Sequence, residues 1–268
     1  MPWGIEVPGD DEHVIYVWFD ALVNYIATLD WPDEGGNFEK YWMNGNPTQY
    51  CGKDNLRFQS AMWQAMLMAA GLPNSHQIVI NGFITADGGL KMSKTLGNVA
   101  DPKEIVKEYG TDALRFFLAK EISNFEDSPF TIERFKDAYN AGLANGLGNL
   151  TSRILTLSEK YLEKTPEIPE SSIPQEFFDH LEVFEIQKST NYIWEKIGEL
   201  DRFIQDTEPF KVVKVDEKKG KELITKMVLD LYTIARMLNS TMPGTSEKIK
   251  KLIKENKKPE QPLFLRKD

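Results

Sequence analysis

Cysteine and histidine are scarce in this 268-residue chain, and it has no long apolar run. A single cysteine, Cys51, excludes a disulfide framework and cannot form a zinc site alone, so a reducing cytoplasm is the expected location. The histidines, His13, His76 and His180, are too scattered for metal-ligand spacing, so no metal site is expected. No run approaches the roughly 18 apolar residues of a membrane span, and the acidic first residues do not resemble a signal peptide.

The charged residues are distributed unevenly. The formal net charge is −9, and residues 1–135 account for it, with 10 basic against 19 acidic residues. Residues 211–268 have the opposite balance, 15 basic against 8 acidic. A basic end on an acidic body can contact phosphates. A solvated, lysine-rich helix end explains the same counts, and both interpretations stay open.

The first hundred residues alternate between predicted strands and helices. The run 13–20 predicts a strand that leads directly into a helix. Two further strands, at 50–51 and 78–80, flank a predicted helix over 56–70 that Gly71 should end. This alternation predicts parallel strands with right-handed crossovers, as in an α/β protein.

The remainder is predicted to be all-α. Asp101-Pro102 predicts a helix start, with proline in the first turn. From Thr131 onward the apolar spacing favours an antiparallel bundle of four helices. These helices are expected at 131–161, 175–205, 218–242 and 245–254.

Two lysines lie three apart in the octamer 91–98, whose sequence is KMSKTLGN. The octamer follows a predicted strand and the turn signal at 87–89, so Lys91 and Lys94 are expected near a strand end, where ligands of open α/β sheets collect. Lysine ammonium groups can stabilise charge that builds up on a leaving pyrophosphate. Two lysines by themselves are more typical of a solvated basic turn, and only the full octamer favours a ligand site.

A second candidate lies at the strand-to-helix turn Gly52-Lys53-Asp54-Asn55. Backbone N–H groups at a helix start can hold an anion, and Asp54 can accept from a ribose hydroxyl or an ammonium group. The alternative is that Asp54 or Asn55 simply caps the helix. The chain has no Walker-type loop, GxGxxG motif or Ser/His/Asp arrangement that would suggest another chemistry.

Aromatic and amide side chains form two further candidates. Trp18 and Tyr25 are seven apart and share a helix face if the helix begins early, where they would suit a thioether substrate or simply pack in a core. Asn149 and Arg153 are four apart on a predicted helix, and such a pair can read unstacked RNA bases or form an internal salt bridge. Phe210 can stack on a base or close the bundle end.

These motifs together resemble one family. The octamer is similar to the KMSKS signature of class I aminoacyl-tRNA synthetases, and nearly the whole chain is similar to the C-terminal half of a bacterial-type methionyl-tRNA synthetase. The segments that carry the similarity are Trp18-Phe19-Asp20-Ala21, Gly52-Lys53-Asp54, Asn81-Gly82-Phe83, the octamer, Tyr109-Gly110-Thr111-Asp112 and the helix with Asn149 and Arg153.

The resemblance implies a fold and substrates. The fold would be the second half of a Rossmann-type parallel sheet over residues 1–98, a stem-contact segment over 99–130 and an anticodon-binding helix bundle over 131–268. The substrates would be methionine, ATP with Mg²⁺, and tRNA(Met).

Roles for individual residues follow from the same resemblance. The two lysines, Lys91 and Lys94, would stabilise pyrophosphate, and Lys94 would bind ATP with Asp54 and Gly82. The methionine pocket would contain Trp18, Tyr25 and Gln59. The anticodon would be read by Asn149, Arg153 and Phe210.

The departures from the family are also informative. The HIGH motif and the first Rossmann half, with its zinc knuckle, are absent from the sequence, so the chain alone is expected to be inactive. Gln59 stands where many relatives carry histidine, and Phe210 where tryptophan is expected, so an amide replaces a titratable group and a stacking ring loses its N–H. The alternatives are a non-catalytic tRNA-binding module, one subunit of a split synthetase with a separate N-terminal half, or a truncated chain.

Overall fold

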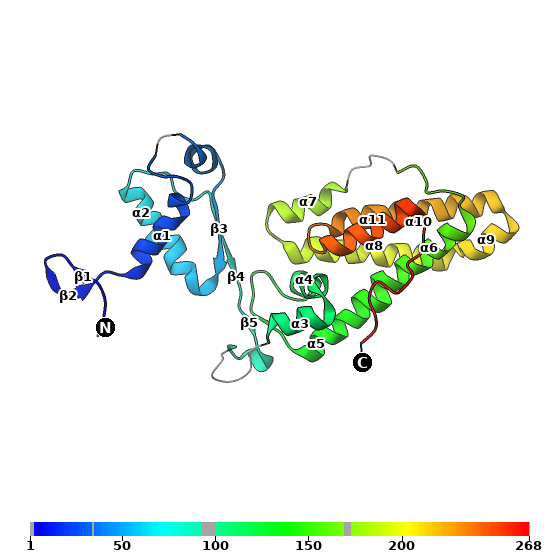
Figure 1. Cartoon of the computed structure of the whole chain (residues 1–268), viewed down its shortest axis with the longest axis horizontal. Helices are drawn as coiled ribbons and strands as arrows, with labels where there is room; N and C mark the ends of the chain where they lie inside the picture. The colour runs from blue at the N-terminus through cyan, green and yellow to red at the C-terminus, as the bar shows by residue number, and fades with distance from the viewer. Residues whose placement is uncertain (1–2, 34, 93–99, 169–172, 268) are drawn as a thin grey trace. The chain divides into compact units, whose positions relative to one another are not determined.

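The computed structural model describes residues 3–33, 35–92, 100–168 and 173–267, and they are mostly helical with small two-stranded sheets (Figure 1). The chain forms two compact units, a first unit over Met1–Phe83 and a second unit over Ile84–Asp268. Among the described helices, none is both long and apolar enough to cross a bilayer.

In its described residues, the first unit contains two small sheets and four helical segments besides one short turn of helix. Its elements are the strands β1 (Glu6–Val7), β2 (Asp10–Val14), β3 (Thr48–Gly52) and β4 (Gln77–Asn81), the helices α1 (Val17–Ala27) and α2 (Trp63–Ala69), the π-helical segments η1 (Glu39–Met43) and η3 (Phe58–Met62), and the 3-10 turn η2 (Lys53–Asn55).

The parallel pairing predicted from the β-α-β alternation is confirmed. Strands β3 and β4 are parallel and in register, from Thr48 opposite Gln77 to Gly52 opposite Asn81. The helical stretch between them, η3 followed by α2, ends where Gly71 has a left-handed φ of +71°. Glycine adopts that conformation without steric cost, which explains the stop.

The strand predicted at 13–20 is wrong in its position. The strand β2 ends at Val14 and pairs antiparallel with β1, whereas α1 already begins at Val17. Apolar residues at the start of α1 continued the strand pattern, and a short apolar run does not distinguish the two structures. The main apolar cluster of the first unit is small, and among the described residues its buried side chains are Leu22, Ile26, Phe38, Trp42, Trp63 and Leu67.

The second unit is dominated by helices. Its elements are the paired strands β5 (Ile84–Thr85) and β6 (Ser128–Pro129), the 3-10 turn η4 (Asp87–Gly89), the π-helical η6 (Tyr139–Gly148), and the helices α3 (Pro102–Tyr109), α4 (Thr111–Lys120), α5 (Ile132–Ala138), α6 (Asn149–Tyr161), α7 (Gln175–Glu182), α8 (Ile186–Thr207), α9 (Pro209–Val215), α10 (Glu217–Leu238) and α11 (Pro243–Glu255).

The predicted helix over 131–161 is present as α5, η6 and α6 without interruption. The predicted helix over 175–205 is divided, because Phe184 has a positive φ of +60° between α7 and α8. Helix α9 was not predicted. It is one short helix after Glu208, which takes a left-handed φ of +42°.

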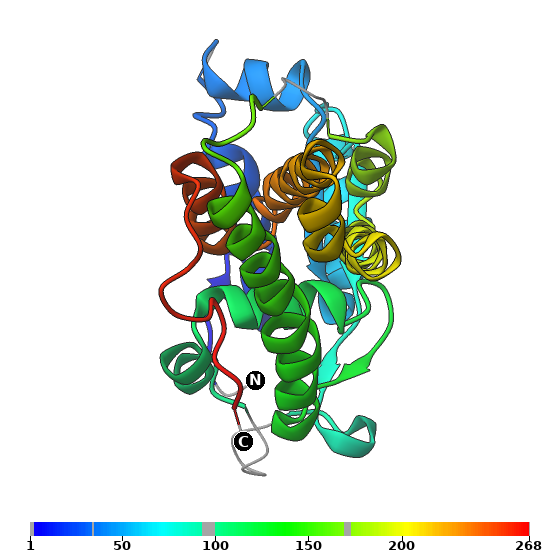
Figure 2. The same cartoon turned by 90° about the vertical axis from the view of Figure 1, so that its right-hand side faces the viewer.

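One continuous core joins the helices of the second unit. Helix α10 packs against α6, α8, α9 and α11, and supplies many of the fully buried apolar residues. The C-terminal segment runs back along the helix over 132–161, as both views show (Figures 1 and 2). There the Tyr139 hydroxyl donates to the carbonyl of Leu265, and the Asn140 amide pairs with the backbone of Lys267.

Candidate functional site

Two of the three predicted pocket residues are brought together in the first unit. Because α1 begins at Val17, Tyr25 lies on its last turns, facing the helical stretch that carries Gln59. The Gln59 Nε2 donates to the Tyr25 Oη at 2.8 Å. The ring of Tyr25 also lies 5.9 Å from that of Trp63, measured between centroids.

Gln59 and Trp63 are four residues apart on one helical face and are only 2% and 1% exposed. Within the described residues, the Gln59 Oε1 and the Trp63 Nε1 are buried without a hydrogen-bond partner. The Gln59 Nε2 already donates to Tyr25, so the proton of the Tyr25 hydroxyl is left for another acceptor. Unpaired buried polar atoms are costly and often mark a site where a ligand or water completes the bonds.

Trp18 occupies a different position from the other predicted pocket residues. Its ring stacks on Phe58 at 4.5 Å between centroids, with an interplanar angle of 14°, and packs against the small core. Sequence analysis did not identify Trp63 as a pocket residue. Its spacing of four from Gln59 is the signal that could have found it.

The predicted phosphate turn and Gly82 lie at the same edge of the parallel sheet. The register places Gly52 opposite Asn81, so Asp54 follows one strand end and Gly82 the next. A Cβ at Gly52 would lie 2.9 Å from the Asp54 Oδ1, so a larger residue here would require the Asp54 side chain to shift. Carboxyl ends of parallel strands are where ligands of open α/β sheets bind.

Asp54 also affects its neighbour Cys51. Partial burial raises the pKa of the Cys51 thiol, and the carboxylate of Asp54 raises that pKa further. The thiol is therefore held in its neutral form at neutral pH. The Lys53 Nζ lies 4.5 Å from the centre of the Phe83 ring, a cation–π contact between the two strand ends.

The lysine loop is only partly described. Lys91 is exposed and forms an isolated antiparallel bridge with Thr85, directly after the predicted turn at Asp87–Gly89. Both glycines of that turn have positive φ, +66° at Gly88 and +76° at Gly89, so the turn signal is explained. Lys94 lies outside the described residues.

The predicted RNA-reading residues lie on helices of the second unit. Asn149 is exposed at the start of α6, and Arg153 follows one turn later. The Arg153 Nη1 donates to the Asp201 Oδ1 on α8, so the internal salt bridge considered as an alternative is present. Phe210, on α9, is 39% exposed, and the Lys211 Nζ lies 6.0 Å from its ring centre.

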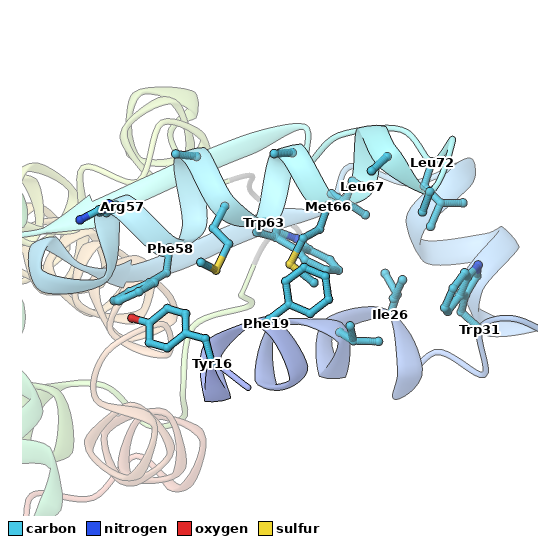
Figure 3. Close-up of a pocket in the computed structure, with 16 residues that line it drawn as sticks. Tyr16, Phe19, Ile26, Trp31, Arg57, Phe58, Trp63, Met66, Leu67 and Leu72 are labelled. Carbon is cyan, nitrogen blue, oxygen red and sulfur yellow. The ribbon is translucent and has the colours of Figure 1, made fainter. Parts of the chain in front are cut away.

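An apolar groove runs between α1 and the helical stretch of η3 and α2 (Figure 3). Its volume is about 1040 Å³. The side chains that line its floor and walls include Tyr16, Phe19, Ile26, Phe58, Met62 and Met66. Large apolar surfaces of this kind mark ligand or protein contacts.

Metal ligands are not clustered within 3–33, 35–92, 100–168 and 173–267: no three His, Cys, Asp or Glu side chains are placed there to hold an ion.

The chain is similar to proteins of one kind. A family model described as tRNA synthetases class I (M) matches residues 1–155. The chain is 36% identical over 263 residues to a methionine–tRNA ligase of Caldanaerobacter subterraneus subsp. tengcongensis. This alignment covers 92% of this chain and 41% of that relative. A methionine–tRNA ligase of Clostridium acetobutylicum is 35% identical, with 92% and 40% covered.

A solved structure agrees with these relatives. Mycobacterium tuberculosis methionyl-tRNA synthetase in complex with methionyl-adenylate superposes with a TM-score of 0.80 and 28% identity. The superposition covers 93% of this chain and 52% of that one. The chain thus spans about two fifths of the length of the curated relatives it matches.

Proposed function

The chain belongs to the methionyl-tRNA synthetase family of class I aminoacyl-tRNA synthetases, and on that premise we propose that it supplies part of a methionine–tRNA ligase. The whole enzyme would activate methionine with ATP and transfer it to tRNA(Met). The first unit would contribute to activation and the helices of the second unit to anticodon recognition.

The hydrogen-bonded pair of Tyr25 and Gln59 is the observation that carries the proposal for the first unit. Both side chains are uncharged. The ring of Trp63 lies next to the ring of Tyr25, so the pair has an aromatic neighbour. A neutral pocket with aromatic walls suits the thioether of methionine, since sulfur packs well against rings and an uncharged side chain needs no counterion. Trp18, stacked on Phe58, would extend the aromatic wall.

Activation would take place at the strand ends. A carboxylate oxygen of methionine would attack the α-phosphorus of ATP, and pyrophosphate would leave with Mg²⁺ that enters as part of the substrate complex. Asp54 and Gly82 would contact the adenosine and aminoacyl groups. Lys91 and Lys94 would stabilise the charge that develops on the pyrophosphate, which accelerates the step because the interaction strengthens in the transition state.

We expect this chain by itself to lack the activity, because the sequence contains no HIGH motif to contact the other side of ATP. The test is methionine-dependent ATP–pyrophosphate exchange, first with the chain alone and then with a separately produced amino-terminal half. Exchange only in the mixture supports the proposal. If the chain alone catalyses exchange above the level of a Lys94→Ala control, the expectation of inactivity is contradicted. If the two halves are folded and their mixture shows no exchange, the catalytic role is contradicted.

For the second unit, we propose recognition of the CAU anticodon by Asn149, Arg153 and Phe210, with residues 99–130 contacting the tRNA stem. An amide and a guanidinium one helical turn apart can bond to base edges, and an exposed ring can stack on a base. The exposed positions of Asn149 and Phe210 support these roles.

A non-catalytic tRNA-binding module is the second candidate, and the continuous core of the second unit favours it. It requires only that unit, and predicts salt-sensitive binding of a CAU stem-loop that Arg153→Ala weakens. Equal affinity for a scrambled loop would eliminate it.

The apolar groove of the first unit favours a further variant, in which a separate N-terminal half docks on this chain. This split enzyme predicts a stable heterodimer when the halves are mixed, measured by sedimentation velocity. Independent sedimentation of the two halves at micromolar concentration would reject it.

A further inference from the structure

Three side chains from α6 and α8 form a polar ladder, defined here as Arg153, Asp201 and Gln205. The Arg153 Nη1 donates to the Asp201 Oδ1, and the Gln205 Nε2 donates to the Asp201 Oδ2 at 2.6 Å. Asp201 therefore uses both carboxylate oxygens, one for each neighbour. Gln205 lies one helical turn after Asp201, on the same face of α8.

The ladder leaves hydrogen-bonding capacity at both ends. A guanidinium has five N–H donors and this contact with Asp201 uses one, whereas the amide of Gln205 retains an Oε1 acceptor and a second N–H. The side chains of Arg153 and Asp201 are 38% and 36% exposed, so an incoming ligand can contact them. Such a partly exposed pair contributes little to the free energy of folding. Its more important effect is to hold the Arg153 side chain in one orientation.

The ladder is close in sequence to the other predicted reading residues. Asn149 precedes Arg153 by one turn of α6, and α8 ends at Thr207, three residues before Phe210. Helices α6, α8 and α9 all pack against α10, which keeps their surfaces in fixed positions. The arrangement combines amides, a guanidinium and an exposed ring, the groups that recognise unpaired RNA bases.

We propose that Asp201 is a positioning residue that orients Arg153 and Gln205, and that Gln205 is a further specificity-determining residue which contacts a base edge of the RNA loop. This inference rests on the proposed anticodon recognition. The carboxylate partly neutralises Arg153, so the guanidinium acts by directed hydrogen bonds rather than as a charge for phosphates. Gln205 extends the row of base-reading groups from α6 to α8.

The test compares affinities of the full chain for a CAU anticodon stem-loop and for loops with one anticodon base changed, by fluorescence anisotropy. The variants are Asp201→Asn and Gln205→Ala. The control is Glu199→Gln, which removes one carboxylate from the same helix, where Glu199 pairs with Lys196. Any general gain in RNA affinity from a lost negative charge is therefore the same in D201N and E199Q.

We expect D201N to reduce the preference for CAU about tenfold, since one bidentate contact discriminates by roughly this factor or more. Gln205→Ala should reduce the preference at one loop position, and E199Q should retain the wild-type preference. Circular dichroism melting curves establish that each variant is folded, and Gln205→Ala, an exposed substitution, provides an independent test if D201N does not fold.

Two results would overturn the inference. One is a D201N preference equal to that of E199Q, and the other is a Gln205→Ala preference unchanged at every position. Uniform weakening of all loops by D201N would also reject positioning, because a purely structural role affects every loop alike. If the wild-type chain binds scrambled and CAU loops equally, the proposed anticodon recognition itself fails, which is a distinguishable outcome.

Discussion

The amide of Gln59 donates to the hydroxyl of Tyr25 at 2.8 Å, across a gap of 34 residues in the sequence. This bond joins α1 to the helical stretch before α2 and fixes which groups face the candidate pocket. The tyrosine oxygen accepts from the amide, so the hydroxyl proton points elsewhere.

Removing the hydroxyl of Tyr25 should destabilise the first unit. In Tyr25→Phe the buried Gln59 Nε2 loses its acceptor, and a buried unsatisfied donor costs about 1–3 kcal/mol. Urea unfolding followed by tryptophan fluorescence measures the effect, because five of the six tryptophans belong to residues 1–83. Tyr41→Phe is the control, since Tyr41 is exposed and its substitution should change the unfolding free energy by less than about 0.5 kcal/mol. Equal midpoints for the two variants would show that the bond contributes nothing to stability.

The Cys51 thiol should react slowly with iodoacetamide, and removing the Asp54 charge should accelerate the reaction. Burial and the carboxylate both raise the thiol pKa, which lowers the thiolate fraction at pH 8. Asp54→Asn removes the electrostatic contribution and lowers the pKa, so the thiolate fraction and the rate both increase. Burial remains, and the variant should still react more slowly than a free thiol. Mass spectrometry of the alkylated chain at pH 7, 8 and 9 gives the rates.

The control for this reaction is Asp20→Asn, which removes an exposed carboxylate from α1. Its alkylation rate should equal that of the unmodified chain. If Asp20→Asn and Asp54→Asn accelerate the reaction equally, the effect is one of net charge, and the specific influence of Asp54 on Cys51 is rejected.

Gly220 and Gly198 provide a matched pair of glycine substitutions in the second unit. A Cβ at Gly220 would lie 2.2 Å from the Cα of Val213, so Gly220→Ala must displace α9 from α10 and should lower stability by about 1–3 kcal/mol. A Cβ at Gly198, inside α8, would meet none of the described atoms within 4 Å, so Gly198→Ala should raise stability by up to about 1 kcal/mol. Helical circular dichroism during thermal unfolding measures both. A Gly220→Ala melting temperature at or above that of Gly198→Ala would contradict the close packing of α9.

The consequence of Gly220 for function is indirect. Helix α9 carries Phe210, and its contact with the first turns of α10 sets the place of that ring. Gly220→Ala should therefore weaken binding of a CAU stem-loop in the same assay as Phe210→Ala, although Gly220 itself is buried. Unchanged RNA affinity in a folded Gly220→Ala variant would show that RNA recognition does not depend on the position of α9.

Local signals predicted much of the fold, because their physical cause is local. Asp101 and Pro102 predicted a helix start, and the Asp101 Oδ1 accepts from the Lys103 backbone N–H at 2.8 Å. Gly71 predicted a helix end, because glycine takes the left-handed φ that ends a helix without steric cost. The short helix α9 and the break at Phe184 were missed, since Glu208 and Phe184 take left-handed φ values that their residue types do not predict.

The candidate site was less predictable than the fold. The spacing of Asn149 and Arg153 placed them on one helix, but the partner of Arg153 is Asp201, 48 residues away. No periodic pattern connects positions on two helices, so the ion pair and Gln205 were found only in the structure. Trp63 differs, because its spacing of four from Gln59 is a local signal, but its ring contact with Tyr25 comes from another helix. The roles of all these residues in binding stay predictions.

A final prediction concerns Asp112, which holds α4 to the start of α11. Its Oδ2 accepts from both the backbone N–H of Thr245, at 2.5 Å, and the Thr245 hydroxyl, at 2.7 Å. A carboxylate at a helix N-terminus satisfies otherwise unpaired N–H groups and interacts favourably with the helix dipole. Asp112→Asn keeps the shape but loses the charge, and should lower the unfolding free energy of the second unit by about 1–2 kcal/mol.

The matched control is Asp137→Asn on α5, an exposed aspartate, which should leave the unfolding free energy within about 0.5 kcal/mol of the unmodified chain. Urea unfolding followed by helical circular dichroism measures both variants.

Arg115 reinforces the same connection between α4 and α11, since its Nε donates to the carbonyl of Thr241 at 2.6 Å, just before α11. Helix α4 lies in the predicted stem-contact segment, and α11 lies in the predicted bundle. Asp112→Asn should therefore weaken binding of full-length tRNA(Met) more than binding of an isolated CAU stem-loop. Equal weakening of the two RNAs would show that this connection does not link stem contact to anticodon recognition.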